Sequence, residues 1–180
     1  GGGKVFVDTI QQTFTPIHII DARPTLSFNH ISNSQNSAIS ASPDSFDDSL
    51  GRIGPDVHGN FLSDNKIDGL FVRINIQNGS PIERLTVPGR FDDSDIAHVL
   101  TQSLIISGNP GGFETDASGA LTARAAGRLM VDPGVVVKLN NARIEAERGG
   151  SALIAEGTEN RPVIFTSLFD DRYGGSGTFN

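Results

Sequence analysis

The sequence predicts an all-β chain whose short strands stack as a solenoid. The main observation is an internal repeat: the stretch from Phe28 to Ala41 aligns without a gap with the stretch from Gly59 to Val72, at an offset of 31 residues. A period of that length is typical of solenoids and other stacked arrays. The composition agrees, because 21 glycines and 9 prolines interrupt the chain too often for long helices.

Each copy of the repeat has the spacing of strands separated by a turn. The matched pairs are Asn29 with Asn60, Ile31 with Leu62, Asn33 with Asp64, Ser34 with Asn65, Ala38 with Gly69, and Ile39 with Leu70. The aliphatic members alternate with polar residues, as half-buried strands do. The Asn, Asp and Ser members are turn formers. In a stack, we expect equivalent asparagines to hydrogen-bond to each other and equivalent aliphatic residues to form a continuous internal column.

The repeat fits a loose pattern, N-x-I-x-[ND]-[NS]-x-x-x-[AG]-I, in both copies. In this respect the chain resembles the right-handed parallel β-helix proteins, the pectate-lyase-like solenoids. The resemblance implies a right-handed, three-sided coil. The same pattern occurs in enzymes, adhesins and structural shafts, so the resemblance leaves the function open.

The second half of the chain continues in a related pattern. Residues 127–167 contain five short apolar runs, separated by turn signals such as Asp132-Pro133-Gly134 and Arg148-Gly149-Gly150. This stretch resembles the coils of large secreted or cell-surface bacterial β-helix proteins. We therefore expect Asn-rich coils over 1–74 and further coils over 104–180, within a single domain spanning 1–180.

Between these two parts, over 75–103, the pattern loosens and predicts a loop and β insertion. Its last piece has two interpretations: Ser94 can cap a helix, or Ile96, His98 and Leu100 can alternate as a strand. The strand is favoured because the apolar run Leu104 to Ile106 follows directly.

Charge and composition limit the partners. A net charge of −7 and scattered basic residues argue against nucleic acid, which requires clustered Lys and Arg. The absence of cysteine removes disulfides and thiol chemistry. No apolar run is long enough to span a membrane, and the first residues do not resemble a signal peptide. Neither end resembles a solenoid cap, so we expect one unit of a longer solenoid, at the cell surface or outside the cell.

Two clusters of acidic residues are candidate calcium sites. Asp92, Asp93 and Asp95 form the denser one, with Asp170 and Asp171 the second. Carboxylate oxygens are the ligands that calcium prefers, although neither cluster has the spacing of an EF-hand loop. The competing interpretation is a solvated acidic loop in the first case and a structural turn with Arg172 in the second.

Catalysis is the alternative, since β-helices include polysaccharide lyases and glycoside hydrolases. A hydrolase needs two carboxylates that face one sugar. In the repeat, Asp64 and Asp68 align with Asn33 and Ser37, so no pair of acids stacks. Tryptophan is absent, and Tyr173 is the sole tyrosine. The sequence therefore predicts no catalytic residue and no cofactor other than calcium.

We accordingly expect a non-enzymatic structural or adhesive segment of a large extracellular protein, a rigid scaffold that displays loops or associates with copies of itself. The alternatives are a carbohydrate-active β-helix enzyme and a calcium-dependent module that binds glycans.

Overall fold

The computed structural model describes residues 4–7, 10–13, 15–48, 53–108, 113–115, 117–123 and 126–174. Nearly all regular structure in these ranges is β-strand, and their one helical element is the short 3₁₀ turn η1 (Pro43–Phe46). The predicted all-β class is confirmed.

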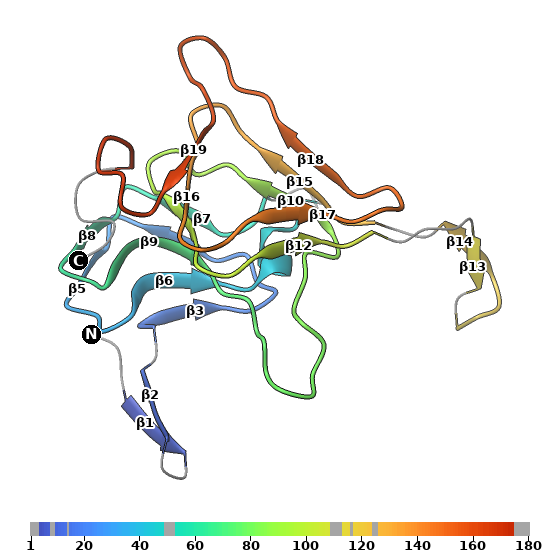
Figure 1. Cartoon of the computed structure of the whole chain (residues 1–180), viewed down its shortest axis with the longest axis horizontal. Coiled ribbons are helices and arrows are strands. Elements are labelled where there is room, and N and C mark those ends of the chain that lie inside the picture. The colour runs from blue at the N-terminus through green and yellow to red at the C-terminus, as the bar shows by residue number, and fades with distance from the viewer. Residues whose placement is uncertain are drawn as a thin grey trace.

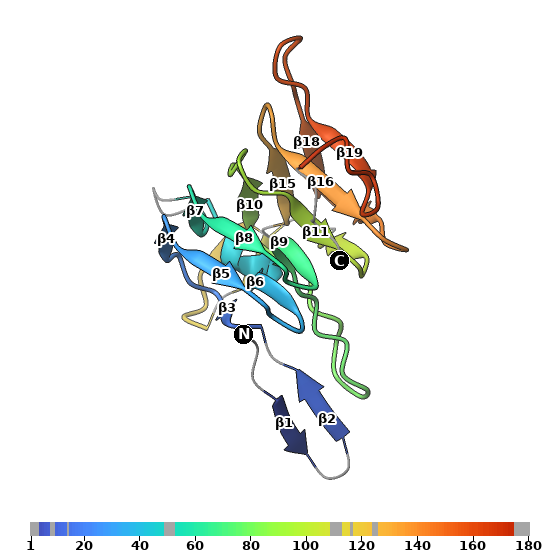
Figure 2. The same cartoon turned by 90° about the vertical axis from the view of Figure 1, so that its left-hand side faces the viewer.

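The largest sheet has six parallel strands in the order β19-β16-β11-β9-β6-β3. Its strands are β3 (Ile17–Ile19), β6 (Ser37–Ala41), β9 (Ile67–Val72), β11 (His98–Leu100), β16 (Val136–Leu139) and β19 (Ile164–Ser167). Spatial order follows chain order, because the chain leaves this sheet after each strand and returns one position further along. Figure 2 shows this progression from the blue strands to the orange and red ones.

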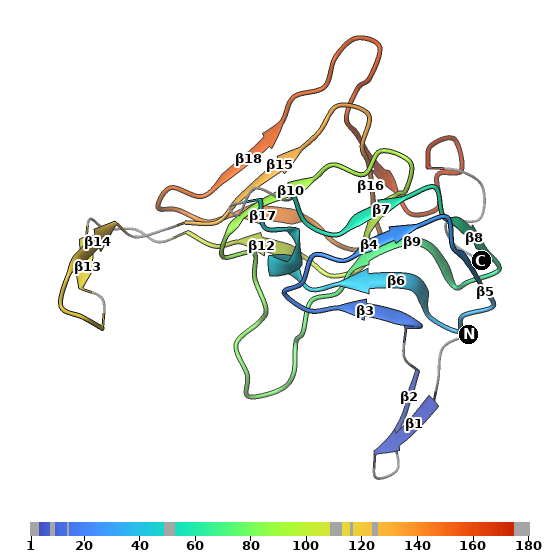
Figure 3. The same ribbon diagram turned by 180° about the vertical axis from the view of Figure 1, so that it is seen from behind.

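The intervening strands form smaller parallel sheets. A three-stranded sheet contains β10 (Pro88–Phe91), β15 (Arg128–Val131) and β18 (Ala152–Ala155). The two-stranded sheets pair β4 (Thr25–Ser27) with β7 (Asp56–His58), β5 (His30–Ser32) with β8 (Phe61–Ser63), and β12 (Leu104–Ile106) with β17 (Ile144–Ala146). Figure 3 shows β10, β15 and β18 side by side. Stacked parallel sheets of this kind are compatible with a solenoid.

Two antiparallel hairpins depart from the parallel pattern. They pair β1 (Lys4–Val7) with β2 (Ile10–Thr13), and β13 (Phe113–Thr115) with β14 (Leu121–Ala123). Both project away from the stacked sheets (Figure 1).

The 31-residue repeat is confirmed by the strand register. Ile31 lies opposite Leu62, and Ile39 lies opposite Leu70, as the alignment predicts. We call β3–β5 the first pass of the chain and β6–β8 the second pass. Equivalent corners even share an unusual backbone conformation, since Asn33 and Asp64 have φ angles of 57° and 56°. Asn and Asp tolerate this left-handed conformation better than most residues, which explains their recurrence.

Asparagines connect the two passes, as predicted. The side-chain oxygen of Asn60 accepts hydrogen bonds from the backbone and side-chain N–H groups of Asn29, both at 3.0 Å. Asn65 is fully buried; its oxygen accepts the backbone N–H of Ser34 at 2.9 Å, while its amide donates to the carbonyl of Ile31 at 2.8 Å. Each asparagine thereby pairs main-chain groups at a corner, where the regular strand ladder is interrupted.

The core consists of apolar columns that run through the stack. Strand register in the six-stranded sheet places one residue of each strand in line, and the column is Ile17, Ile39, Leu70, His98, Val137 and Phe165. Four of the six are fully buried, whereas Phe165, the last, is 44% exposed. In the three-stranded sheet, Leu129 is fully buried while Leu153, the next in line, is 41% exposed. The columns therefore end in exposed apolar side chains at β18 and β19.

The structure places much of the 75–103 stretch within the sheets. β10 and β11 belong to the two larger sheets, which confirms the strand interpretation of residues 98–100. Within 75–103, the part that leaves the sheets is the connection between β9 and β10. Near its end, Leu85 forms an isolated bridge with Ile106 and lies in the core again. This connection breaks the 31-residue period, because no later strand among the described residues pairs with β7 or β8.

The corner asparagines lead to a stability prediction. Replacing Asn65 with alanine leaves the buried Ser34 N–H and Ile31 carbonyl without their partner, so the free energy of unfolding should fall by about 2–4 kcal/mol. The matched variant Asn60→Ala, at a half-buried corner, should lose about 1 kcal/mol. Urea unfolding of both variants measures the difference; equal losses would contradict the structural role of burial at the Asn65 corner.

Candidate functional site

The most unusual polar site in the described residues lies on the free edge of β7. In a parallel ladder, alternate residues direct their N–H and C=O groups to opposite sides. Asp56 and His58 face β4, since the Asp56 N–H donates to the Pro24 carbonyl and the Phe28 N–H donates to the His58 carbonyl. Val57 and Gly59 therefore face the other edge, where no strand of the described ranges pairs with β7.

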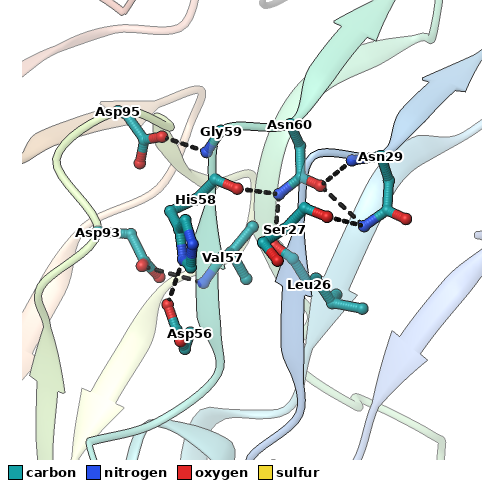
Figure 4. Close-up of polar contacts among 10 residues, drawn as sticks. All are labelled: Leu26, Ser27, Asn29, Asp56, Val57, His58, Gly59, Asn60, Asp93 and Asp95. Carbon is teal, nitrogen blue, oxygen red and sulfur yellow. Dashed lines mark hydrogen bonds and ion pairs between the residues drawn. The ribbon is translucent and has the colours of Figure 1, made fainter.

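Two aspartates take the place of the missing strand (Figure 4). The Asp93 carboxylate accepts the N–H of Val57 at 3.0 Å, and the Asp95 carboxylate accepts the N–H of Gly59 at 2.7 Å. The two acids are two residues apart, as are the two N–H groups that they bind. They thus reproduce with side chains the pairing that a strand supplies with carbonyls, and a charged acceptor makes the stronger hydrogen bond.

Gly59 is needed for this corner. Its φ of 63° is left-handed, and a Cβ there would lie 2.8 Å from the ring of Phe28. Phe28 itself, the equivalent residue of the first pass, has a φ of 55° and is 80% exposed. Its ring contacts the edge of His58, with the ring centroids 5.7 Å apart. The His58 ring also binds the carboxylate of Asp56, at 2.6 Å.

Burial changes the protonation of the capping acids. Desolvation raises the pKa of Asp93 to about 7, against the opposing effect of the Val57 N–H, and the nearby charges of Asp92, Asp95 and Asp56 raise it further. Desolvation also raises the pKa of Asp92, with a further contribution from Asp132. At neutral pH, Asp93 is therefore divided between its charged and neutral forms.

The three acids of the first predicted calcium cluster thus make different contacts. Asp93 and Asp95 bind backbone N–H groups, while the charged neighbours with the largest effect on the pKa of Asp92 are Asp132 and Arg90. Throughout the described ranges, no three His, Asp or Glu side chains converge as metal ligands. Calcium binding by Asp92, Asp93 and Asp95 stays a prediction.

The second predicted cluster forms a local turn. The Asp170 carboxylate accepts two hydrogen bonds from the Arg172 guanidinium, at 2.8 and 3.0 Å, and one from the Thr166 hydroxyl at 2.5 Å. Arg172 and Thr166 hold the pKa of Asp170 well below its usual range. Both oxygens of Asp170 are engaged, as the structural-turn interpretation expects. Asp171 contributes a charge beside the buried Lys138.

His98 is a buried titratable residue that sequence reasoning placed on a strand without a role. It occupies the core column between Leu70 and Val137, and its ring stacks on Phe91 with centroids 4.4 Å apart. Neither ring nitrogen has a hydrogen-bond partner among the residues that the structure describes. Desolvation lowers the pKa of His98 to about 3, so the ring is neutral at physiological pH.

A hollow of about 210 Å³ adjoins the Asp95 cap, on the free edge of β8. Its lining includes Asn60, Phe61 and Leu62 from the second pass, with Asp68 and Asp95. Sequence reasoning did not predict this hollow; the signal for it was that the 31-residue repeat occurs in two copies, so that β8 gains no partner at that offset on its other side.

No family model matches the chain, and no curated protein or solved structure is significantly similar to it. The functional argument therefore depends on the residues of this chain.

The Asp93 cap predicts an unusual pH dependence. An acid whose pKa is higher in the folded state than in the unfolded state destabilises the fold above the folded value, and the penalty disappears as the pH falls toward 4. Asp93→Asn keeps an oxygen for the Val57 N–H and removes the charge. We expect it to raise the free energy of unfolding by about 1 kcal/mol at pH 8, after allowance for partial solvent exposure, and by nothing near pH 4. Urea unfolding at both values tests this; an equal effect at both would contradict it.

His98 predicts the opposite dependence. A base whose pKa is lowered in the folded state contributes full stability above its unfolded value of 6.5 and loses it as the pH falls toward 3. The free energy of unfolding should thus fall by about 2–3 kcal/mol between pH 7 and pH 4.5 through this one group.

His98→Leu should remove that part of the pH dependence of the unfolding free energy, because leucine fills a similar volume and cannot be protonated. The measurement is denaturant unfolding of both proteins across this pH range. Parallel pH profiles for the two proteins would show that His98 is not the titrating group.

Proposed function

We propose that this chain is a non-enzymatic structural segment of a larger extracellular or cell-surface protein, built as a right-handed parallel β-helix. The stacked parallel sheets and the confirmed repeat support the β-helix. Right-handedness follows the general rule that crossovers between parallel strands of one sheet are right-handed in about 98% of cases. Among the described residues, no helix is long and apolar enough to cross a membrane.

The observation that carries the proposal is the free end of the stack at β17, β18 and β19. Within the part of the chain that the structure describes, each of these strands pairs on one side only. The core columns continue into this end, where Leu153 and Phe165 are 41% and 44% exposed. Open edges with apolar side chains are the surfaces on which strands of another chain add. We infer that further parallel strands cover this end, and that in a solution of this chain alone the first pass of a second copy supplies them, head to tail.

The use of the carboxylates supports a scaffold over an enzyme. Across the described chain, acids from distant positions bind groups of neighbouring passes and connect them. These contacts are Asp44 with Thr86, Asp47 with Arg23, Asp132 with Arg90, and Glu147 with Arg84. A hydrolase instead keeps two carboxylates directed at a substrate. The carbohydrate-active enzyme and the calcium-dependent glycan-binding module remain the alternatives.

Substitutions that introduce charges at the free end of the stack test self-association. The wild-type chain should show a sedimentation coefficient that rises with protein concentration. Replacing Leu153 and Phe165 together with lysine should abolish that rise, since the charged side chains oppose burial while their exposed positions tolerate the change.

The matched control is Leu121→Lys, at a 72% exposed position on the projecting β14. It should associate as the wild type does. A wild-type chain that stays monomeric at all concentrations, or a control that loses association equally, would contradict the proposal.

A further inference from the structure

The free edge of β8 differs from that of β7 because no side chain of the described residues caps it. The Phe61 N–H donates to the Asn29 carbonyl at 2.8 Å, and the Ser63 carbonyl accepts the Asn33 N–H at 3.3 Å, so residues 61 and 63 face β5. By the alternation of a parallel ladder, the N–H and C=O of Leu62 face the opposite side. That side is the 210 Å³ hollow, and the described residues supply no main-chain partner for Leu62 there.

The lining of the hollow is completed by Gly174 and by Ile96 and Ala97, which lead into β11. The Ala97 carbonyl is engaged by the Leu70 N–H at 2.9 Å. The volume is below the range of about 300–1,000 Å³ that is usual for small-molecule pockets. The hollow is therefore small for an enclosed ligand, whereas the strand edge beside it offers the main-chain groups of Leu62 to an extended chain.

The polar groups of the hollow are acidic. Asp95 uses one carboxylate oxygen for the Gly59 N–H, and Asp68 uses one for Asn65. The second oxygen of each has no hydrogen bond to a described residue, and the described residues that line the hollow include neither lysine nor arginine. The ring of Phe61 lies beside them, 62% exposed. Two carboxylates and an aromatic ring favour a cation with an aliphatic stem.

We propose that the free edge of β8 binds an extended, basic segment of a partner protein, which adds as a strand beside Leu62 and places a lysine or arginine side chain against Asp68 and Asp95. Main-chain hydrogen bonds to Leu62 supply the docking, and the two acids select the charge. The site lies on the side of the stack, apart from its end. It goes beyond the proposed head-to-tail association, and either can fail without the other.

The free protein offers a first test by amide hydrogen exchange. The Leu62 amide should exchange faster than the Phe61 and Ser63 amides, because it faces the hollow while they face β5. Equal protection of all three amides would overturn the free edge and with it the proposal.

Binding is tested with a capped five-residue peptide of alternating valine and threonine with lysine at its centre. Titration into the isotopically labelled chain should shift the Leu62 amide resonance saturably. The same peptide with glutamate at its centre should bind at least about ten-fold more weakly, because it meets like charges. Equal binding of the two peptides, or no shift at Leu62 with the lysine peptide, would overturn the proposal.

Two further controls separate strand addition from charge attraction. Two peptides are N-methylated at alternate amides, one at the odd-numbered amides and the other at the even-numbered ones. Their affinities should differ, because a strand presents only alternate amides to the edge. Asp68→Asn and Asp95→Asn keep an oxygen for their present backbone or amide donors, and each should weaken the lysine peptide about three-fold. Glu156→Gln, an exposed acid outside the hollow, should have no effect. Equal binding of both methylated peptides, or equal effects of all three variants, would contradict strand addition at this site.

Discussion

The structure depends on the pairing of short strands across successive passes of the chain. Strands of three to six residues have few hydrogen bonds of their own, so each gains its partners from the passes before and after it. Where the 31-residue offset holds, as between Ile31 and Leu62, this pairing is regular and the corners are closed by asparagine. Where the offset fails, main-chain groups of the second pass are left for side chains to pair.

The regular pairing at the 31-residue offset was predictable from the sequence. The alignment of Asn29 with Asn60 and of Ile39 with Leu70 predicted both the register and the asparagine contacts, because identical backbone geometry requires the same residues at the same corner. The stacking of the aliphatic residues Ile31 and Leu62 followed from the same offset. His98 was placed on a strand, yet nothing in the sequence showed that this strand would bring it between Leu70 and Val137, since the offset there is no longer 31.

The candidate site was predictable only in part. The close spacing of Asp92, Asp93 and Asp95 identified this segment as a candidate site. That spacing alone does not distinguish ligands for an ion from acceptors for backbone N–H groups. That distinction depends on which edge the loop lies against, which is a long-range consequence of the connection between β9 and β10. Asp93 and Asp95 are two residues apart, as are the N–H groups of Val57 and Gly59 that they bind, because alternate residues of a strand face the same edge.

The free edges of this chain differ in chemistry, and that difference bears on what each can bind. At β18 and β19 the exposed residues are Leu153 and Phe165, so a partner there gains by burying apolar surface, as a further pass of the same kind does. Beside β8 the groups are Asp68 and Asp95, whose charges oppose the addition of another acidic segment. Since the chain carries a net charge of −7, a second copy is disfavoured on this side. The acidic edge therefore protects the stack from lateral self-pairing while it leaves Leu62 accessible to a basic strand.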